Sequence, residues 1–199
     1  MQNNEGALNS TLFYVHNLNV LLCRERDEQN LAARLQRENI GRGRPGVHLR
    51  FSLVWRRCDG VNIPEHSVSG GKEGGTVTYV GRAEHEGQEI PGRVVPGNGC
   101  YVSYEGGEHR YDKYDVLVND GNLLKWIRSS AGTVPSKAIV GGKTTSGEKL
   151  YIGRTEHNGS LILGRIQPSH GCLYIPCAGA EHRYTDYEVL VTEFLFPIG

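Results

Sequence analysis

The sequence predicts an all-β protein, an antiparallel β-sandwich built from two repeats that are related by a pseudo-twofold axis and can be intertwined. The first observation is that the region from 55 to 191 carries the same motifs twice, about seventy residues apart, as expected of an internal duplication. The second is that 27 of the 199 residues are glycine, roughly twice the average usage of about 7%, which indicates many tight turns. The third is that short strand-like segments recur between these turns in both copies.

The N-terminal extension, residues 1–52, differs in composition from the rest. It contains only four of the 27 glycines and no lysine, since the first lysine of the chain is Lys72. The segment 24–39 is rich in Arg, Glu, Gln, Leu and Ala, which predicts a short surface helix that ends at the glycines and proline of 41–46. A contact with a partner or an anionic surface is one interpretation of its arginines. A solvated helix or poorly ordered extension is favoured, because acidic residues neutralise much of the charge.

The β-rich unit, residues 53–193, divides into a first copy at 53–121 and a second copy at 122–193. Runs of β-branched and aromatic residues bounded by glycine turns predict four strands in each copy. Glu86-Gly87 and Asn158-Gly159 are good two-residue turns between the first two strands of each copy. The predicted strands are 76–82, 89–95, 100–104 and 114–118 in the first copy, and 149–154, 161–166, 172–175 and 187–191 in the second.

Composition and charge exclude several function classes. The 22 basic and 22 acidic residues give a formal net charge of zero, whereas a nucleic-acid partner would favour a basic face. No apolar run approaches the roughly 18 to 20 residues of a membrane span, so no transmembrane segment is expected. The first residues lack a basic start and a small-residue cleavage site, so we expect no secretion signal.

Five cysteines occur without CxxC or zinc-type Cys/His spacing. Reduced and mostly buried thiols are therefore expected. Cys100 and Cys172 occupy equivalent positions after a glycine, inside apolar runs. We expect both in the core.

One dipeptide, Glu-His, occurs four times and raises the question of a metal or catalytic site. Adjacent residues on a strand point to opposite faces, and nothing in the spacing makes three or four ligands converge, so no metal is expected. A structural role, in which the carboxylate accepts backbone or tyrosine hydrogen bonds, is favoured. The pairs are Glu84-His85, Glu108-His109, Glu156-His157 and Glu181-His182.

No nucleophile elbow, phosphate-binding glycine loop or activated cysteine motif is present in the sequence. We therefore expect no catalytic residues, no cofactor and no enzymatic activity. Arginine and aromatic residues at matched positions suit a sugar site, because hydroxyls need donors and acceptors and a sugar ring packs on an aromatic face. The same residues fit a salt-bridged β-surface and core equally well. They are Arg82 and Arg154, Arg93 and Arg165, Tyr79 and Tyr151, Tyr111 and Tyr184, Tyr114 and Tyr187, and Trp55 and Trp126.

Several motifs in order over about 53 to 193 resemble the DM-nine repeat, which normally occurs as a tandem pair. They are Tyr-Val/Ile-Gly-Arg, Pro91-Gly92-Arg93-Val94, Gly106-Gly107-Glu108-His109 and Tyr187-Glu188-Val189-Leu190-Val191. The resemblance implies a β-sandwich fold, since characterised members are β-sandwich proteins. Some are mannose-binding lectins of invertebrate innate immunity that often lack a signal peptide, and dimers are known in the family. Related repeats accompany a pore-forming module in natterin-like toxins.

In the lectin members, the resemblance implies a sugar site that uses an acidic residue shortly after Gly-Gly and the lysine of Pro-Gly-Lys. The matching positions here are Glu73 and Arg93 in the first copy, and Thr144 and Arg165 in the second. All four depart from the pattern, and exchanging lysine for the planar fork of arginine is not conservative at a hydrogen-bonding site. Thr144 removes the carboxylate altogether. We therefore expect the first-copy site to be the better candidate.

These observations predict a non-enzymatic, carbohydrate-binding lectin of the mannose type that recognises glycans or pathogens. We expect mannose-containing glycans as ligands, a homodimer, and a location in the cytoplasm, on vesicles, or outside the cell after release without a signal peptide. The alternative is a non-enzymatic protein-interaction scaffold that responds to infection or stress.

Overall fold

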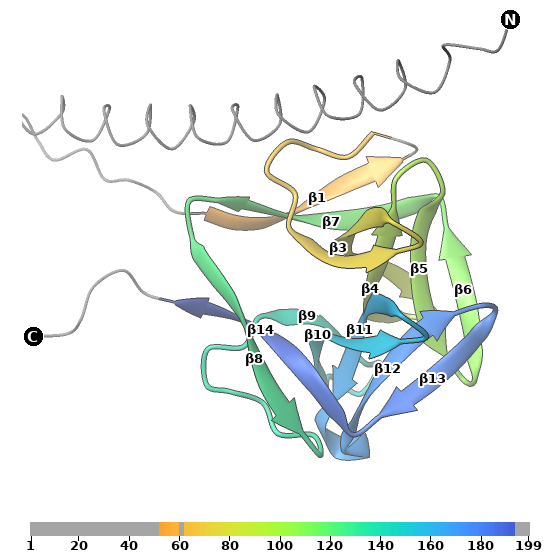
Figure 1. Cartoon of the computed structure of the whole chain (residues 1–199), viewed down its shortest axis with the longest axis vertical. Coiled ribbons are helices and arrows are strands. Elements are labelled where there is room, and N and C mark those ends of the chain that lie inside the picture. Colours follow the sequence, from red (N-terminus) through yellow and green to blue (C-terminus); the bar gives the residue numbers. More distant parts are fainter. Residues whose placement is uncertain (1–51, 60–61, 194–199) are drawn as a thin grey trace, which may run out of the picture. The chain divides into compact units, whose positions relative to one another are not determined.

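The computed structural model describes residues 52–59 and 62–193. These residues form fourteen antiparallel strands and one short 3₁₀ turn, η1 (Pro168–His170), which confirms the predicted all-β class (Figure 1). The predicted N-terminal extension, with its helix at 24–39, lies outside the described residues except for Ser52. None of the described segments is a helix long and apolar enough to cross a membrane.

The two copies contribute seven strands each, in matching order. Those of the first copy are β1 (Ser52–Asp59), β2 (Ser69–Glu73), β3 (Thr76–His85), β4 (Gln88–Val95), β5 (Gly99–Tyr104), β6 (Gly107–Tyr111) and β7 (Lys113–Asp120). Those of the second copy are β8 (Leu123–Ser130), β9 (Val140–Lys143), β10 (Lys149–His157), β11 (Ser160–Gln167), β12 (Cys172–Cys177), β13 (Ala180–Tyr184) and β14 (Asp186–Glu193).

The pairing of these strands confirms two intertwined, pseudo-twofold-related repeats. Within the first copy the order is β1-β7-β3-β4-β5-β6, and the second copy repeats it as β8-β14-β10-β11-β12-β13. Three pairings cross between the copies, namely β2 with β11, β9 with β4, and β13 with β6. As a result, β3, β4, β9, β10, β11 and β2 form a closed ring to which both copies contribute.

Three hydrophobic clusters follow this arrangement. One lies within the first copy around Ile90 and Val102, and its counterpart lies within the second around Ile162 and Ile175. The third joins the copies, with Val80 facing side chains of β10 and β11. Because this shared cluster needs strands from both copies, neither copy encloses its whole core alone.

The predicted hairpin turns are confirmed. Glu86 and Asn158 have positive φ angles of 48° and 50°, and the following glycines have φ of 76° in both cases. Two successive residues with positive φ define the hairpin turn that matches the twist of antiparallel strands. The sequence prediction missed β1, β2 and β6 with their counterparts. β2 and β9 contain paired glycines and β6 and β13 are short and polar, so they lack the apolar alternation that marks a strand.

The described cysteines are free thiols, as expected. Cys58, Cys100 and Cys172 are buried and Cys177 is half-buried, whereas Cys23 lies outside the described residues. Burial raises the pKa of the Cys100 thiol far above its ordinary value. Cys100 and Cys172 are fully enclosed in the core, in agreement with their matched positions.

Candidate functional site

Two arginines at equivalent positions lie deep between the copies. Arg93 on β4 and Arg165 on β11 are 4% and 5% exposed. Burying a charged group is costly unless it is paired and hydrogen-bonded. The partners of each guanidinium therefore decide what the surrounding site can do.

The glycine before each arginine allows the close approach of the next strand. A Cβ atom at Gly92 would lie 2.0 Å from the backbone oxygen of Tyr101, and one at Gly164 would lie 2.0 Å from that of Tyr174. Only glycine fits at such a distance. The Gly-Arg motif thus places each arginine against the face of the tyrosine on the next strand. The guanidinium carbon lies 4.8 Å from the ring centroid both for Arg93 and Tyr101 and for Arg165 and Tyr174.

The guanidinium of Arg93 is fully engaged by protein groups. Its Nη1 donates to the Glu73 carboxylate, its Nη2 donates to Glu108 Oε1 at 2.7 Å, and its Nε donates to the backbone oxygen of Pro176 at 3.2 Å. Two carboxylates therefore balance one positive charge. The structure brings the two predicted first-copy residues, Glu73 and Arg93, into direct contact with each other.

The guanidinium of Arg165 is only partly engaged. Its Nη2 donates to Glu181 Oε1 at 2.9 Å, while its Nε is buried without a hydrogen-bond partner among the described residues. The ring of Tyr104, from the first copy, lies 5.8 Å from the guanidinium on a different strand from Tyr174. A pocket of about 340 Å³, which we call the Arg165 cleft, opens here, lined in part by Gln88, Tyr104, Gln167, His170, Tyr174 and Glu181.

The remaining predicted residue, Thr144, uses its hydroxyl within its own turn. Thr144 Oγ1 is hydrogen-bonded to Ser146 Oγ at 2.9 Å and accepts from the backbone N–H of Glu148 at 3.0 Å. The Glu148 carboxylate accepts hydrogen bonds from Gln167 and Ser169. Burial opposes its ionisation, but these hydrogen bonds outweigh burial and lower the pKa of Glu148. No carboxylate of the second copy therefore takes the place that Glu73 has beside Arg93.

The Glu-His pairs on β6 and β13 have the predicted structural role. Glu108 Oε2 accepts the backbone N–H of Gly179 at 2.7 Å, and Glu181 Oε2 accepts that of Gly106 at 2.9 Å. Each carboxylate thus joins the arginine of its own copy to a turn of the other copy. This exchange holds the two arginines at the junction of the repeats.

The histidine of each of these pairs packs against a second histidine of its own copy, with the two rings tilted relative to each other. The ring centroids of His85 and His109 are 4.2 Å apart, and those of His157 and His182 are 4.3 Å apart. Burial and the neighbouring histidine lower the pKa of both His85 and His157. Within the part of the chain that the structure describes, no three His, Cys, Asp or Glu side chains converge as a metal site would require.

Sequence reasoning missed most of the Arg165 cleft. Tyr174 could have been found, because it occupies the position in the predicted third strand of the second copy that Tyr101 occupies in the first. Tyr104 gave no such signal, since Cys177 occupies its position in the other copy and its contact with Arg165 crosses between copies. Gln167 and His170 lie where the two copies differ in sequence.

Comparisons with known proteins agree with this architecture. The model of the DM9 repeat matches residues 72–184. Natterin-3 of Thalassophryne nattereri is 34% identical over 47% of this chain and 24% of its own length, and natterin-4 is 30% identical over 71% of this chain and 34% of its own length. This chain therefore spans about a third or less of these relatives. The crystal structure of the nematode sperm cell motility protein MFP2B has a similar fold, with a TM-score of 0.54 and 15% identity over 80% of this chain and 52% of that chain.

Proposed function

The chain belongs to the DM9 repeat family, and from this premise we propose that it is a non-enzymatic carbohydrate-binding protein, a lectin that recognises mannose-type glycans of pathogens or internal membranes. The resemblance to mannose-binding members supports the ligand class. The location is proposed to be the cytoplasm, vesicle surfaces, or the exterior after release without a signal peptide. The proposed assembly is a homodimer.

The observation that carries this proposal is the partly engaged guanidinium of Arg165. Its Nη2 is bonded to Glu181, and its Nη1 donates to no group of the described residues, whereas the side chain lines an open pocket of about 340 Å³. A ligand hydroxyl that accepts from Nη1 would add a hydrogen bond to a charged group, which contributes about 1.5 to 3 kcal/mol. Glu181 supplies an acceptor, and the rings of Tyr104 and Tyr174 supply apolar faces.

The second copy is therefore the copy that we propose binds sugar. In the first copy, the carboxylate of Glu73 already occupies the Nη1 atom of Arg93, so a ligand hydroxyl must compete with an ion pair. In the second copy, Thr144 leaves that place without a carboxylate. The sequence difference that favoured the first copy thus favours the second once the geometry is known.

Single sugar sites are weak, since a Kd of about 1 mM corresponds to only about 4 kcal/mol. A dimer would present the cleft twice, and linkage of two sites raises the overall affinity without any new contact.

Calorimetric titration with methyl α-mannoside tests the proposal. We expect Tyr174→Ala to weaken binding at least tenfold, because it removes the ring that covers the cleft. The matched variant Tyr101→Ala, at the equivalent position of the first copy, should bind as the wild type does. Loss of binding in Tyr101→Ala alone would show that the sugar binds beside Arg93 and not beside Arg165. The proposal would be refuted if the wild-type protein bound no neutral glycoside.

A further inference from the structure

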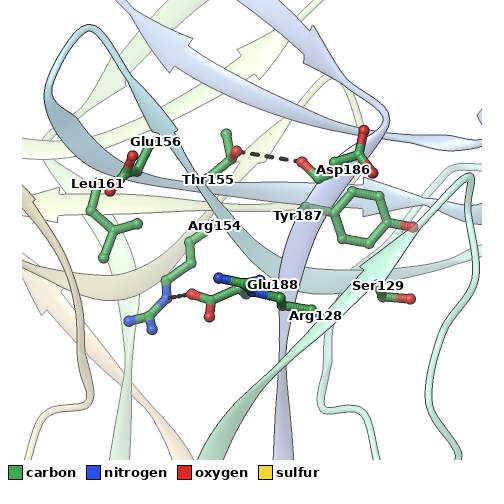
Figure 2. Close-up of a pocket in the computed structure, with 9 residues that line it drawn as sticks. All are labelled: Arg128, Ser129, Arg154, Thr155, Glu156, Leu161, Asp186, Tyr187 and Glu188. Carbon is green, nitrogen blue, oxygen red and sulfur yellow. Dashed lines mark hydrogen bonds and ion pairs between the residues drawn. The ribbon is translucent and has the colours of Figure 1, made fainter.

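A second cleft lies on the second copy, between β8, β10, β11 and β14 (Figure 2). It has a volume of about 520 Å³ and shares no lining residue with the Arg165 cleft. Its floor is a row of three charged side chains. Glu188 on β14 is directly opposite Arg128 on β8 and directly opposite Arg154 on β10, so all three project from the same face. We call it the Arg128 cleft.

The inner end of this row is firmly held. Arg154 Nε donates to Glu188 Oε2 at 2.7 Å (Figure 2). Arg154 Nη1 donates to the backbone oxygen of Gly70 at 3.0 Å. The guanidinium also lies 4.1 Å from the ring centroid of Trp126. The Arg154–Glu188 end of the floor is thus ordered before any ligand arrives, which lowers the entropic cost of binding.

The equivalent place in the first copy is tied by ion pairs. Asp115 bonds both Arg57, at 3.4 Å, and Arg82, at 3.0 Å, and Glu89 approaches Arg82 at 3.5 Å. All four charged groups are therefore paired with one another.

The second copy differs at the positions that make those pairs. Leu161 stands where the first copy has Glu89, so one carboxylate is absent from the row. Arg128, the counterpart of Arg57, is exposed and has no hydrogen bond or ion pair to any residue in 52–59 or 62–193. A guanidinium with free donors therefore stands at the edge of a cleft.

The lining also holds two hydroxyl groups, Ser129 and Thr155, where the first copy has Cys58 and Ala83. Both already donate to backbone oxygens, Ser129 Oγ to that of Thr133 at 2.8 Å and Thr155 Oγ1 to that of Asp186 at 3.4 Å. Glu156 and Asp186 add exposed carboxylates to the lining. Arg128 therefore supplies the free donors and the two carboxylates supply acceptors, and the side chain of Leu161 offers an apolar surface.

We propose that the Arg128 cleft is a second binding site for a neutral sugar ring. Two arginines and three carboxylates line it, so the charges nearly cancel and neither an anion nor a cation gains from the whole set. Adjacent hydroxyls of a neutral ring accept from Arg128 and donate to Asp186 or Glu156, while a C–H face packs on Leu161. The inference goes beyond the proposed function, because it adds a site with separate residues. With both clefts occupied, one chain would bind two sugar rings of the same branched glycan.

Amide chemical-shift titration of the ¹⁵N-labelled full chain tests this inference, with the methyl glycosides of mannose, glucose and galactose as probes and glucuronate as the charged comparison. We expect saturable shifts at Arg128, Thr155 and Asp186 with a neutral glycoside. Leu161→Glu gives the second copy the carboxylate of the first, and it should weaken binding at this cleft at least tenfold. Arg57→Ala, the first-copy counterpart of an Arg128→Ala change, should leave binding at this cleft unaltered.

Arg128→Ala is the companion variant, because an exposed side chain can be removed without disturbing the core. It should weaken binding at this cleft about tenfold and leave the shifts around Tyr174 in place. Three results would overturn the inference: no saturable shift here with any neutral glycoside, shifts that persist in both variants, or binding of glucuronate alone. Shifts that appear around Tyr174 but not here would overturn this inference and leave the proposed function standing.

Discussion

The different charge balance of the two buried arginines predicts unequal effects of the same substitution in the two copies. Glu108→Gln and Glu181→Gln each replace the carboxylate that holds an arginine by an amide of the same shape. After Glu108→Gln, Arg93 still has the Glu73 carboxylate. After Glu181→Gln, Arg165 has no carboxylate among its hydrogen-bond partners in the described structure.

The expected magnitudes follow from burial. The side chains of Arg165 and Glu181 are 6% and 8% exposed, and breaking a buried ion pair by removing one partner costs about 3 to 5 kcal/mol. Arg93 keeps one ion pair, so Glu108→Gln should cost only a charge-assisted hydrogen bond, about 1.5 to 3 kcal/mol. Glu181→Gln should therefore destabilise the protein by about 2 kcal/mol more than Glu108→Gln does.

Urea unfolding of the wild type and both variants, followed by far-ultraviolet circular dichroism, measures this difference. With a slope of about 2 kcal/mol/M, the midpoint of Glu181→Gln should lie about 1 M below that of Glu108→Gln. Equal midpoints, or a lower midpoint for Glu108→Gln, would refute the assignment of two carboxylates to Arg93 and one to Arg165.

Three further predictions concern stability and thiol chemistry. Burial and a neighbouring histidine lower the pKa of His85 and of His157, so their contribution to stability is complete above about pH 6.5, the unfolded value, and declines as the pH falls through the lower folded values. A Tm that does not decrease between about pH 7.5 and about pH 5 would contradict this. Gly164→Ala should cost about 3 kcal/mol, because its Cβ would lie 2.0 Å from a backbone oxygen of β12; a calorimetric Tm equal to that of the wild type would disprove the close approach. Maleimide labelling followed by peptide mass spectrometry should find the half-buried Cys177 modified and the enclosed Cys100 protected in the folded protein, and equal labelling rates would count against the predicted core.

Local sequence signals predicted the strands and turns of the fold because they arise from short-range physics. Glu86-Gly87 favours a hairpin turn wherever it stands, and the alternating residues around Val80 favour a strand with one buried face. The pairing of Lys72 on β2 with Leu161 on β11 could not be identified in this way. This pairing joins backbone groups of two segments that are far apart in the sequence, and neither segment carries a local pattern that identifies its partner.

The candidate site shows the same limit. The sequence identified the arginines and the loss of a carboxylate at Thr144, and it predicted that the two copies differ. The direction of the difference depended on whether Glu73 faces a ligand or the arginine beside it. Only the fold shows that its carboxylate is bonded to Arg93, and that Tyr104 of one copy lies near Arg165 of the other.

A crystal structure of the full chain soaked with methyl α-mannoside tests the central claim most directly, because it identifies the copy that binds sugar. The partly engaged guanidinium of Arg165 predicts sugar density between Tyr104 and Tyr174, with a hydroxyl within hydrogen-bonding distance of Arg165 Nη1. Density at Arg93, with the Glu73 carboxylate displaced, and none at Arg165 would contradict it.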